Sequence, residues 1–193
     1  MSRPVYINVR GCNGSGKTTL LRSLAKALQP LSRGAVSPPD HKPIPVTYCH
    51  GGIAILGDYT PEATGTTAGC DRIKTQDATK RALEIIGRDP EVKVVLFEGV
   101  VVSTIFGPWK DWAECTAPGP LWWVFLDTPV SLCLRRIQQR NGGKPIKEEL
   151  VTDKHLTISR VRDKADQAGL NVVVLDHERA LSELRKLIAE VAK

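Results

Sequence analysis

Long apolar runs are missing from this chain, and none approaches the roughly 20 residues that a membrane-spanning helix needs. The N-terminus, Met1-Ser2-Arg3-Pro4, leads directly into an expected strand without the apolar core of a signal peptide. The five cysteines form no C-x-x-C pair and have no histidines at zinc-ligand spacing, which argues against a zinc module and a disulfide framework. These absences predict a cytoplasmic protein with no membrane segment and with reduced cysteines.

Aromatic residues are also scarce, at 5%, and the sequence contains neither internal repeats nor a low-complexity tail. With 41% hydrophobic and 25% charged residues, the composition is that of an ordinary globular protein. A chain of 193 residues can bury a sizeable core and fits one domain, which we place over residues 1–193. These properties leave the oligomeric state open between a monomer and a homodimer.

The strongest positive feature is the pattern G-x-x-x-x-G-K-[ST], which directly follows an apolar run at residues 5–9. Its glycines let the backbone turn sharply and aim successive N–H groups at one anion, at the start of an amphipathic helix. In a phosphate-binding loop of this kind Lys17 reaches the β- and γ-phosphates, and Thr18 offers its hydroxyl to Mg²⁺. We therefore assign the following residues to the phosphates of a bound nucleotide: Gly11, Cys12, Asn13, Gly14, Ser15, Gly16, Lys17, Thr18 and Thr19.

The rest of the chain alternates between strand and helix patterns. Apolar runs typical of parallel strands covered on both faces lie at residues 92–97, 121–126 and 171–175. They alternate with helical patterns at residues 75–87, 147–168 and 178–191. A short extended pair is expected at residues 46–49 and 53–56, after a proline-dense surface loop at residues 29–45. The alternation predicts an α/β fold with a parallel sheet of about five strands and helices on both faces.

Glu98 directly follows the apolar run at residues 92–97 and precedes Gly99. A carboxylate at the carboxyl end of a buried strand lies beside the phosphate loop in this topology. There it can hold a magnesium-bound water or accept a proton from an attacking hydroxyl. The structural alternative is an acidic residue that only ends the strand.

A basic segment follows Asp127-Thr128-Pro129, in which Pro129 is suited to start a helix and Asp127 or Thr128 to cap it. Residues 135–164 contain nine Lys or Arg residues against four acids, which favours an anionic partner such as DNA. We expect residues 135–150 to form a lid over the transferring phosphate, whereas a solvated surface is the alternative. The expected lid charges are Arg135, Arg136 and Arg140, with Arg135 also assigned to the nucleotide.

The acceptor half of the site has weaker signals. Asp71 and Arg72 precede the expected helix at residues 75–87 and could read a sugar or base and grip a phosphate, although Asp71 could equally cap that helix. Asp58 lies in the loop before them. Trp109, expected in the loop after Glu98, could stack on a base. We therefore expect these residues in the acceptor site.

Taken together, the segments GCNGSGKTTLL, LFEG and VFLDTPVSLCLRRIQQR resemble the thymidylate kinase-like branch of P-loop nucleoside and nucleotide kinases. Within that branch they are most similar to the phage enzymes that phosphorylate 5-hydroxymethyluracil in DNA. The resemblance covers most of the chain and implies γ-phosphoryl transfer from ATP with Mg²⁺. It also departs from thymidylate kinases, which usually place an Asp-Arg-aromatic triplet where this chain has Glu98-Gly99. The departure implies an acceptor hydroxyl that needs a base rather than a phosphate.

We therefore predict an ATP- and Mg²⁺-dependent kinase whose acceptor is 5-hydroxymethyl-deoxyuridine in DNA, with Lys17, Glu98, Arg136 and Arg140 as catalytic residues. A free deoxynucleoside or its monophosphate is the alternative acceptor. A P-loop ATPase or switch without a small acceptor is a second alternative. The sequence lacks the guanine-reading motif N-K-x-D, which argues against a GTPase switch.

Overall fold

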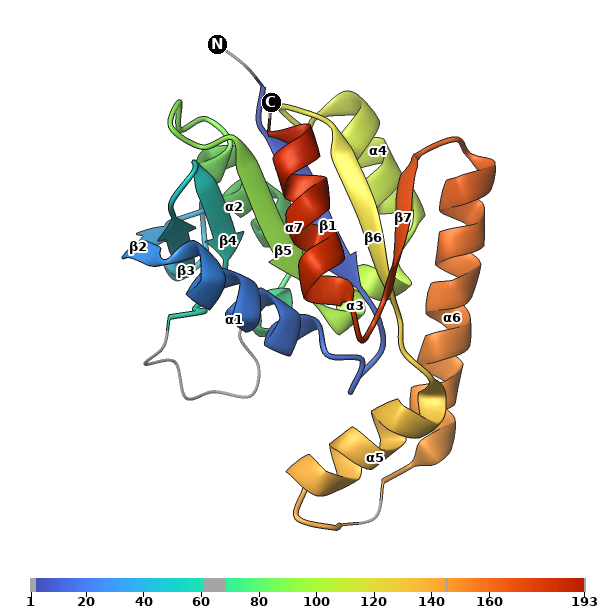
Figure 1. Cartoon of the computed structure of the whole chain (residues 1–193). Coiled ribbons are helices and arrows are strands. Elements are labelled where there is room, and N and C mark those ends of the chain that lie inside the picture. Colours follow the sequence, from blue (N-terminus) through green and yellow to red (C-terminus); the bar gives the residue numbers. More distant parts are fainter. Residues whose placement is uncertain (1–2, 61–68, 145, 193) are drawn as a thin grey trace.

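The computed structural model describes residues 3–60, 69–144 and 146–192, and their strands form a seven-stranded sheet with the order β2-β3-β4-β5-β1-β6-β7 (Figure 1). Strands β4, β5, β1, β6 and β7 are parallel, whereas β2 and β3 extend the sheet by antiparallel pairing. The strands are β1 (Val5–Arg10), β2 (Pro30–Val36), β3 (Ile44–Cys49), β4 (Ile53–Leu56), β5 (Val94–Glu98), β6 (Leu121–Asp127) and β7 (Asn171–Asp176).

Helices cover both faces of the sheet. One face packs against α1 (Lys17–Leu28) and α7 (Ala180–Val191), which bury their leucines against β1, β5 and β6. The other face packs against α2 (Gln76–Ile86), α3 (Val100–Thr104), α4 (Gly107–Cys115) and α6 (Glu148–Gln167). Helix α5 (Val130–Arg140) projects from the end of the sheet at which α1 begins (Figure 1). A short 3-10 helix, η1 (Cys70–Arg72), precedes α2.

The predicted α/β class and the helices on both faces are confirmed, but the predicted strand number is wrong. The difference comes partly from residues 29–45, expected as a loop, where β2 pairs antiparallel with β3 in the register Val36↔Ile44. Proline is tolerated there because β2 is an edge strand and Pro30 is its first residue. Proline density thus excluded a helix correctly but did not exclude an edge strand.

The helices expected at residues 75–87, 147–168 and 178–191 are confirmed as α2, α6 and α7, with ends that differ by at most two residues. Thr75 caps α2 by accepting a hydrogen bond from the Ala78 N–H at 3.1 Å. No helix within the described ranges is long and apolar enough to cross a membrane.

A buried arginine joins the sheet to the segment that follows β5. The Arg10 side chain is 0% exposed, and its guanidinium carbon lies 3.8 Å from the centre of the Trp123 ring. It donates hydrogen bonds to the carbonyl oxygens of Ser103 and Ile105, at 3.3 and 3.1 Å. The Asn8 side-chain oxygen, in the amide orientation that satisfies both groups, accepts two more. Arg10 therefore links the end of β1, where the phosphate loop begins, to the backbone of residues 103–105.

We expect Arg10→Lys to lower the free energy of unfolding by about 1–3 kcal/mol, because an ammonium cannot reach all the oxygens that the planar guanidinium satisfies. Denaturant unfolding of the variant and of the wild-type protein measures this difference. An unchanged midpoint would show that the fork of hydrogen bonds does not contribute to stability.

Candidate functional site

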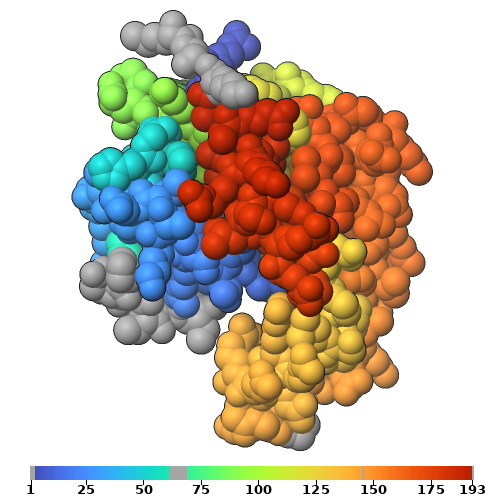
Figure 2. Space-filling view, viewed as in Figure 1, coloured from blue at the N-terminus to red at the C-terminus, as the bar shows by residue number. Residues whose placement is uncertain are grey.

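A cavity of about 600 Å³ opens at the carboxyl ends of the parallel strands. Figure 2 shows the corresponding hollow between α5 and the body of the molecule. Loop residues, the start of α1, the end of β5 and one face of α5 line it, and it contains the cations Lys17, Arg22, Arg136 and Arg140. This concentration of positive charge suits a polyphosphate.

The phosphate loop lies between β1 and α1, as predicted. Gly14 and Gly16 have positive φ values of 78° and 102°, so a side chain would strain the backbone at both positions. A Cβ at Gly14 would also clash with the carbonyl of Cys133 in α5, and one at Gly11 would lie 2.5 Å from the Ser15 Oγ. The glycines are therefore required both by the turn and by the close approach of neighbouring groups.

The Lys17 ammonium is buried within this loop. Its Nζ donates hydrogen bonds to the carbonyls of Gly11 and Cys12, at 2.8 and 3.1 Å. Burial lowers its pKa, and the nearby carboxylates of Glu98 and Asp71 partly oppose that shift. The side chain is thus held at the position from which it can meet a phosphate.

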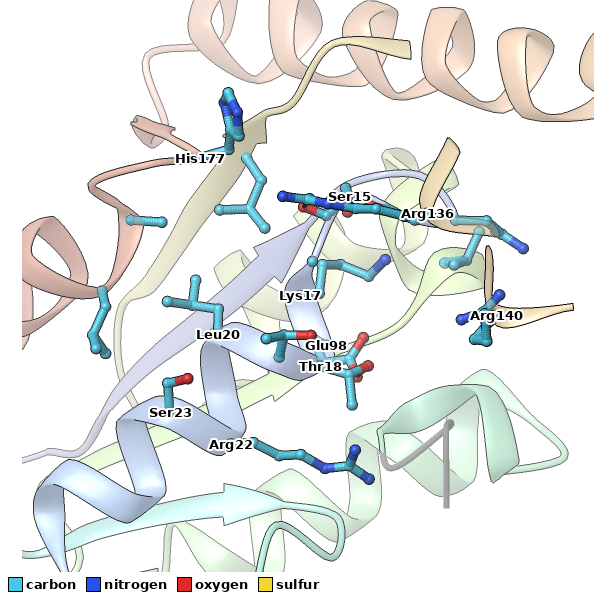
Figure 3. A pocket seen from close by; sticks show the side chains of 18 of the residues that line it. Ser15, Lys17, Thr18, Leu20, Arg22, Ser23, Glu98, Arg136, Arg140 and His177 are labelled. Carbon is cyan, nitrogen blue, oxygen red and sulfur yellow. Dashed lines mark hydrogen bonds between the residues drawn. The ribbon is translucent and has the colours of Figure 1, made fainter. Parts of the chain in front are cut away.

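Glu98 lines the same cavity. Its carboxylate is at the end of β5, is 3% exposed, and accepts a hydrogen bond from the Thr18 hydroxyl at 2.7 Å. The Tyr59 hydroxyl donates a second hydrogen bond to the same oxygen, Oε1, at 3.0 Å. Figure 3 shows the Thr18 and Glu98 side chains together below Lys17. A carboxylate therefore lies directly beside the phosphate loop.

Helix α5 brings arginine side chains to the same space. Arg136 Nη1 lies 3.4 and 3.3 Å from the carbonyl oxygens of Gly14 and Ser15, to which it donates, and Arg140 lines the cavity beside it (Figure 3). Arg135 is exposed and does not line the cavity, because a helix turns about 100° per residue. The structure thus brings Arg136 and Arg140, but not Arg135, to the cavity.

The segment before α5 supports the loop instead of capping the helix. Thr128 was expected, with Asp127, as the N-cap, but Pro129 occupies that position without a side-chain cap. The Thr128 hydroxyl is buried and donates to the Ser15 carbonyl at 2.9 Å. The preference of threonine for helix caps was thus outweighed by a tertiary contact with the phosphate loop.

Cys12 and Gly11 lie on the opposite side of the loop, where they line a smaller cavity with His155. The Cys12 and Cys133 sulfurs are 3.5 Å apart, and hydrogen bonding between them lowers the pKa of Cys12, while burial opposes the shift. The other predicted loop residues, from Asn13 to Thr19, line the larger cavity.

The structure does not bring together the four residues that were expected in the acceptor site. Asp71 lines the cavity and caps α3 by accepting hydrogen bonds from the N–H groups of Val100 and Val101, at 2.9 and 3.1 Å. Arg72 is exposed outside the cavity, and Asp58 forms an ion pair with Arg33 at 2.9 Å. Of this set, only Asp71 is therefore beside Glu98.

Trp109 cannot stack on a base in this structure, so that expectation is wrong. Its side chain is 0% exposed in α4, packs against Phe97 and donates to the Gln76 side chain at 2.8 Å. We expected a loop there from the sequence, but Gly107 and Pro108 begin α4 instead.

Sequence reasoning missed Tyr59 in the acceptor half, as well as Arg22, His177 and Glu178 around the cavity. Tyr59 and His177 follow the carboxyl ends of β4 and β7, so the strand-end rule that found Glu98 could also have found them. Arg22 is one turn after Thr18 on α1, which a helical projection from the loop would have revealed.

The residues around the loop fit a magnesium ion. Thr18 and Glu98 supply a hydroxyl and a carboxylate, the hard oxygen ligands that Mg²⁺ takes. Within the described ranges no group of three or more His, Cys, Asp or Glu side chains could hold a metal by itself. A metal here would consequently take its remaining ligands from phosphate oxygens and water, as Mg²⁺ commonly does.

A family model described as "5-hmdU DNA kinase" matches residues 2–174 of the chain. The chain is 64% identical over 185 residues to the 5-hmdU DNA kinase of Pseudomonas phage M6, covering 95% of this chain and 97% of the relative. It is 32% identical over 200 residues to the 5-hmdU DNA kinase of Pseudomonas phage PaMx11, covering 97% and 99%. Among solved structures it is similar to a gluconokinase from Sinorhizobium meliloti 1021, with a TM-score of 0.49, 19% identity and coverage of 100% and 94%.

Proposed function

This chain belongs to the 5-hmdU DNA kinase family, and on that premise we propose that it transfers the γ-phosphoryl group of ATP to the hydroxymethyl oxygen of 5-hydroxymethyl-deoxyuridine in DNA. The observation that supports this reaction best is the 2.7 Å hydrogen bond between Thr18 and Glu98, which links the phosphate loop to a carboxylate. The named relatives come from bacteriophages, and we propose that this chain likewise acts in the host cytoplasm.

The donor half consists of the loop from Gly11 to Thr18 and the start of α1. The Lys17 ammonium and the loop N–H groups bind the β- and γ-phosphates, and the helix N-terminus adds a partial positive charge. Thr18 would hold Mg²⁺ through its hydroxyl, with Glu98 near enough to hold a metal-bound water, and the ion when bound would neutralise charge on the phosphates. These contacts orient the γ-phosphoryl group toward the Glu98 side of the cavity.

The acceptor half uses Glu98 as the general base. A hydroxymethyl group is neutral, so it needs a base as the oxygen attacks, whereas a phosphate acceptor is already anionic. The Glu98 carboxylate accepts the hydroxyl proton while the new O–P bond forms, and the bond from the γ-phosphorus to the bridging oxygen of ADP breaks. The remaining catalysis comes from holding the two reactants in line and from stabilising the charge on the phosphoryl group that is transferred.

Arg136 and Arg140 belong to the proposed lid at residues 135–150, which closes on the phosphates that are transferred. The structure is consistent with this role because both side chains line the cavity from α5. The basic residues of α6 that face solvent would contact DNA phosphates, so the KM for DNA is expected to rise with salt.

The proposed reaction is tested with γ-labelled ATP and three acceptors: DNA that contains 5-hydroxymethyluracil, free deoxynucleosides and dTMP. Label on the hydroxymethyl group of DNA supports the proposal. Label only on free phosphate would leave an ATPase, and label on nucleosides or dTMP but not on DNA would identify a different acceptor.

Arg136→Ala is expected to lower kcat by about 100-fold, because the developing charge on the phosphoryl group loses a donor that reaches the loop. Arg135→Ala, one position earlier but outside the cavity, is expected to change the rate far less. Initial rates of labelled phosphate transfer measure both variants. Equal rates in the two variants would show that Arg136 does not stabilise the phosphoryl group during transfer.

A further inference from the structure

We propose that Tyr59 is a positioning residue for Glu98: with Thr18 it holds the carboxylate oxygen Oε1, so that Oε2 receives the proton of the acceptor hydroxyl. This inference rests on the proposed function of the same site. It assigns a role to a residue outside the phosphate loop, on the segment that follows β4.

Both hydrogen bonds to Glu98 end on the same atom. The Thr18 and Tyr59 hydroxyls donate to Oε1 at 2.7 and 3.0 Å. Because a carboxylate oxygen offers two lone pairs, these donors fill its capacity. Among the residues that the structure describes, Oε2 accepts no hydrogen bond and is therefore the oxygen with capacity for a substrate proton. Two fixed donors also prevent the carboxylate from rotating between equivalent orientations.

The tyrosine is itself held firmly. Its side chain is 2% exposed, and its N–H donates to the Thr47 hydroxyl at 2.9 Å, while that hydroxyl donates to the Gly57 carbonyl at 3.0 Å. Burial, and after it the Glu98 carboxylate, raises the pKa of Tyr59 well above its ordinary value. The phenol consequently remains protonated and keeps donating over the working pH range.

The electrostatic surroundings of Glu98 come from several elements. Within the described ranges, the titratable and charged groups that face it are Lys17 and Arg22 of α1, Tyr59, and Cys70 and Asp71 of η1. Burial raises the pKa of Cys70 well above its ordinary value, so that thiol stays neutral. Removing the Tyr59 hydroxyl leaves every one of these charges in place and changes only the hydrogen bonding of the carboxylate.

The test is Tyr59→Phe, which deletes one oxygen. Loss of this donor leaves the Glu98 carboxylate less well oriented, so kcat is expected to fall about 10-fold. The KM for ATP should stay unchanged, since Tyr59 does not contact the phosphate loop.

The matched control is Tyr6→Phe. Tyr6 is also fully buried and donates to a backbone carbonyl, that of Leu83 at 3.3 Å, but it lies away from the cavity. It should lose stability while keeping kcat near the wild-type value. An unchanged kcat in folded Tyr59→Phe, with the wild-type protein phosphorylating the DNA, would refute the positioning role and leave the proposed function intact. A wild-type protein that labels no acceptor would instead count against the proposed function.

A second variant keeps the inference testable if Tyr59→Phe does not fold. The chain has three tyrosines, so Tyr6→Phe with Tyr48→Phe leaves Tyr59 alone for replacement by 3-fluorotyrosine. Fluorine makes the phenol a stronger donor at nearly the same size. The kcat of the fluorinated protein should then differ from that of the same double variant with ordinary tyrosine, and an equal kcat would contradict the inference.

Discussion

Lys17→Ala is expected to reduce phosphoryl transfer to below about one-thousandth of the wild-type rate, at the upper end of what one electrostatic donor contributes. The Lys17 ammonium is the buried cation within the phosphate loop itself, 2.8 Å from the Gly11 carbonyl. Alanine leaves the charge of the transferring γ-phosphoryl group without this partner. The rate is measured with labelled ATP at saturating DNA, and a separate ATP-binding titration should show weaker binding as well.

Lys26→Ala is the control for this variant. Lys26 is in the last turn of the same helix, faces solvent, and should keep nearly the full rate. Circular dichroism of both variants checks that α1 still forms. A Lys17→Ala protein that is folded and retains a tenth or more of the rate would contradict the assignment of the donor site.

Glu98→Gln is expected to lower kcat by about 100- to 10,000-fold, the range that general base catalysis contributes, with ATP binding largely kept. Glutamine preserves the shape of the side chain and can still accept the hydroxyl hydrogen bonds of Thr18 and Tyr59, which lie 2.7 and 3.0 Å away. It cannot accept a proton from the acceptor.

Magnesium titration separates the two roles that a carboxylate could have here. If Glu98 only held a metal-bound water, excess Mg²⁺ would restore the rate of Glu98→Gln, whereas a missing base is not restored. Glu190→Gln, an exposed position on α7, controls for the loss of one negative charge. Full activity of Glu98→Gln at ordinary Mg²⁺ would refute both roles.

The features of the site that could be predicted are those that short stretches of sequence specify. The phosphate loop was recognisable because its chemistry resides in consecutive residues, Gly11 to Thr18, whose spacing alone fixes the turn and the helix start. Glu98 was recognisable because a polar residue after a run of buried apolar residues marks the carboxyl end of a strand. Both depend on local sequence and on one general rule of α/β topology.

The errors came from residues whose roles depend on partners far away in sequence. Trp109 was expected in a loop, but its ring is enclosed by Phe97 and its N–H is satisfied by Gln76. Residues 30–36 form a strand because residues 44–49 offer them an edge to pair with. No local propensity encodes either contact, because each requires the whole sheet and its helices to be in place.

The sequence by itself determined the donor half of this protein, from the phosphate loop and strand pattern to a carboxylate at the end of β5. Only the tertiary structure decided the orientation of that carboxylate, by bringing Tyr59 from the end of β4 and Thr18 from α1 to the same oxygen. It also decided which neighbouring arginine of α5 faces the cavity. The physical reason is that hydrogen bonds and helix faces are set by three-dimensional approach, whereas the turn of the loop is set by adjacent residues.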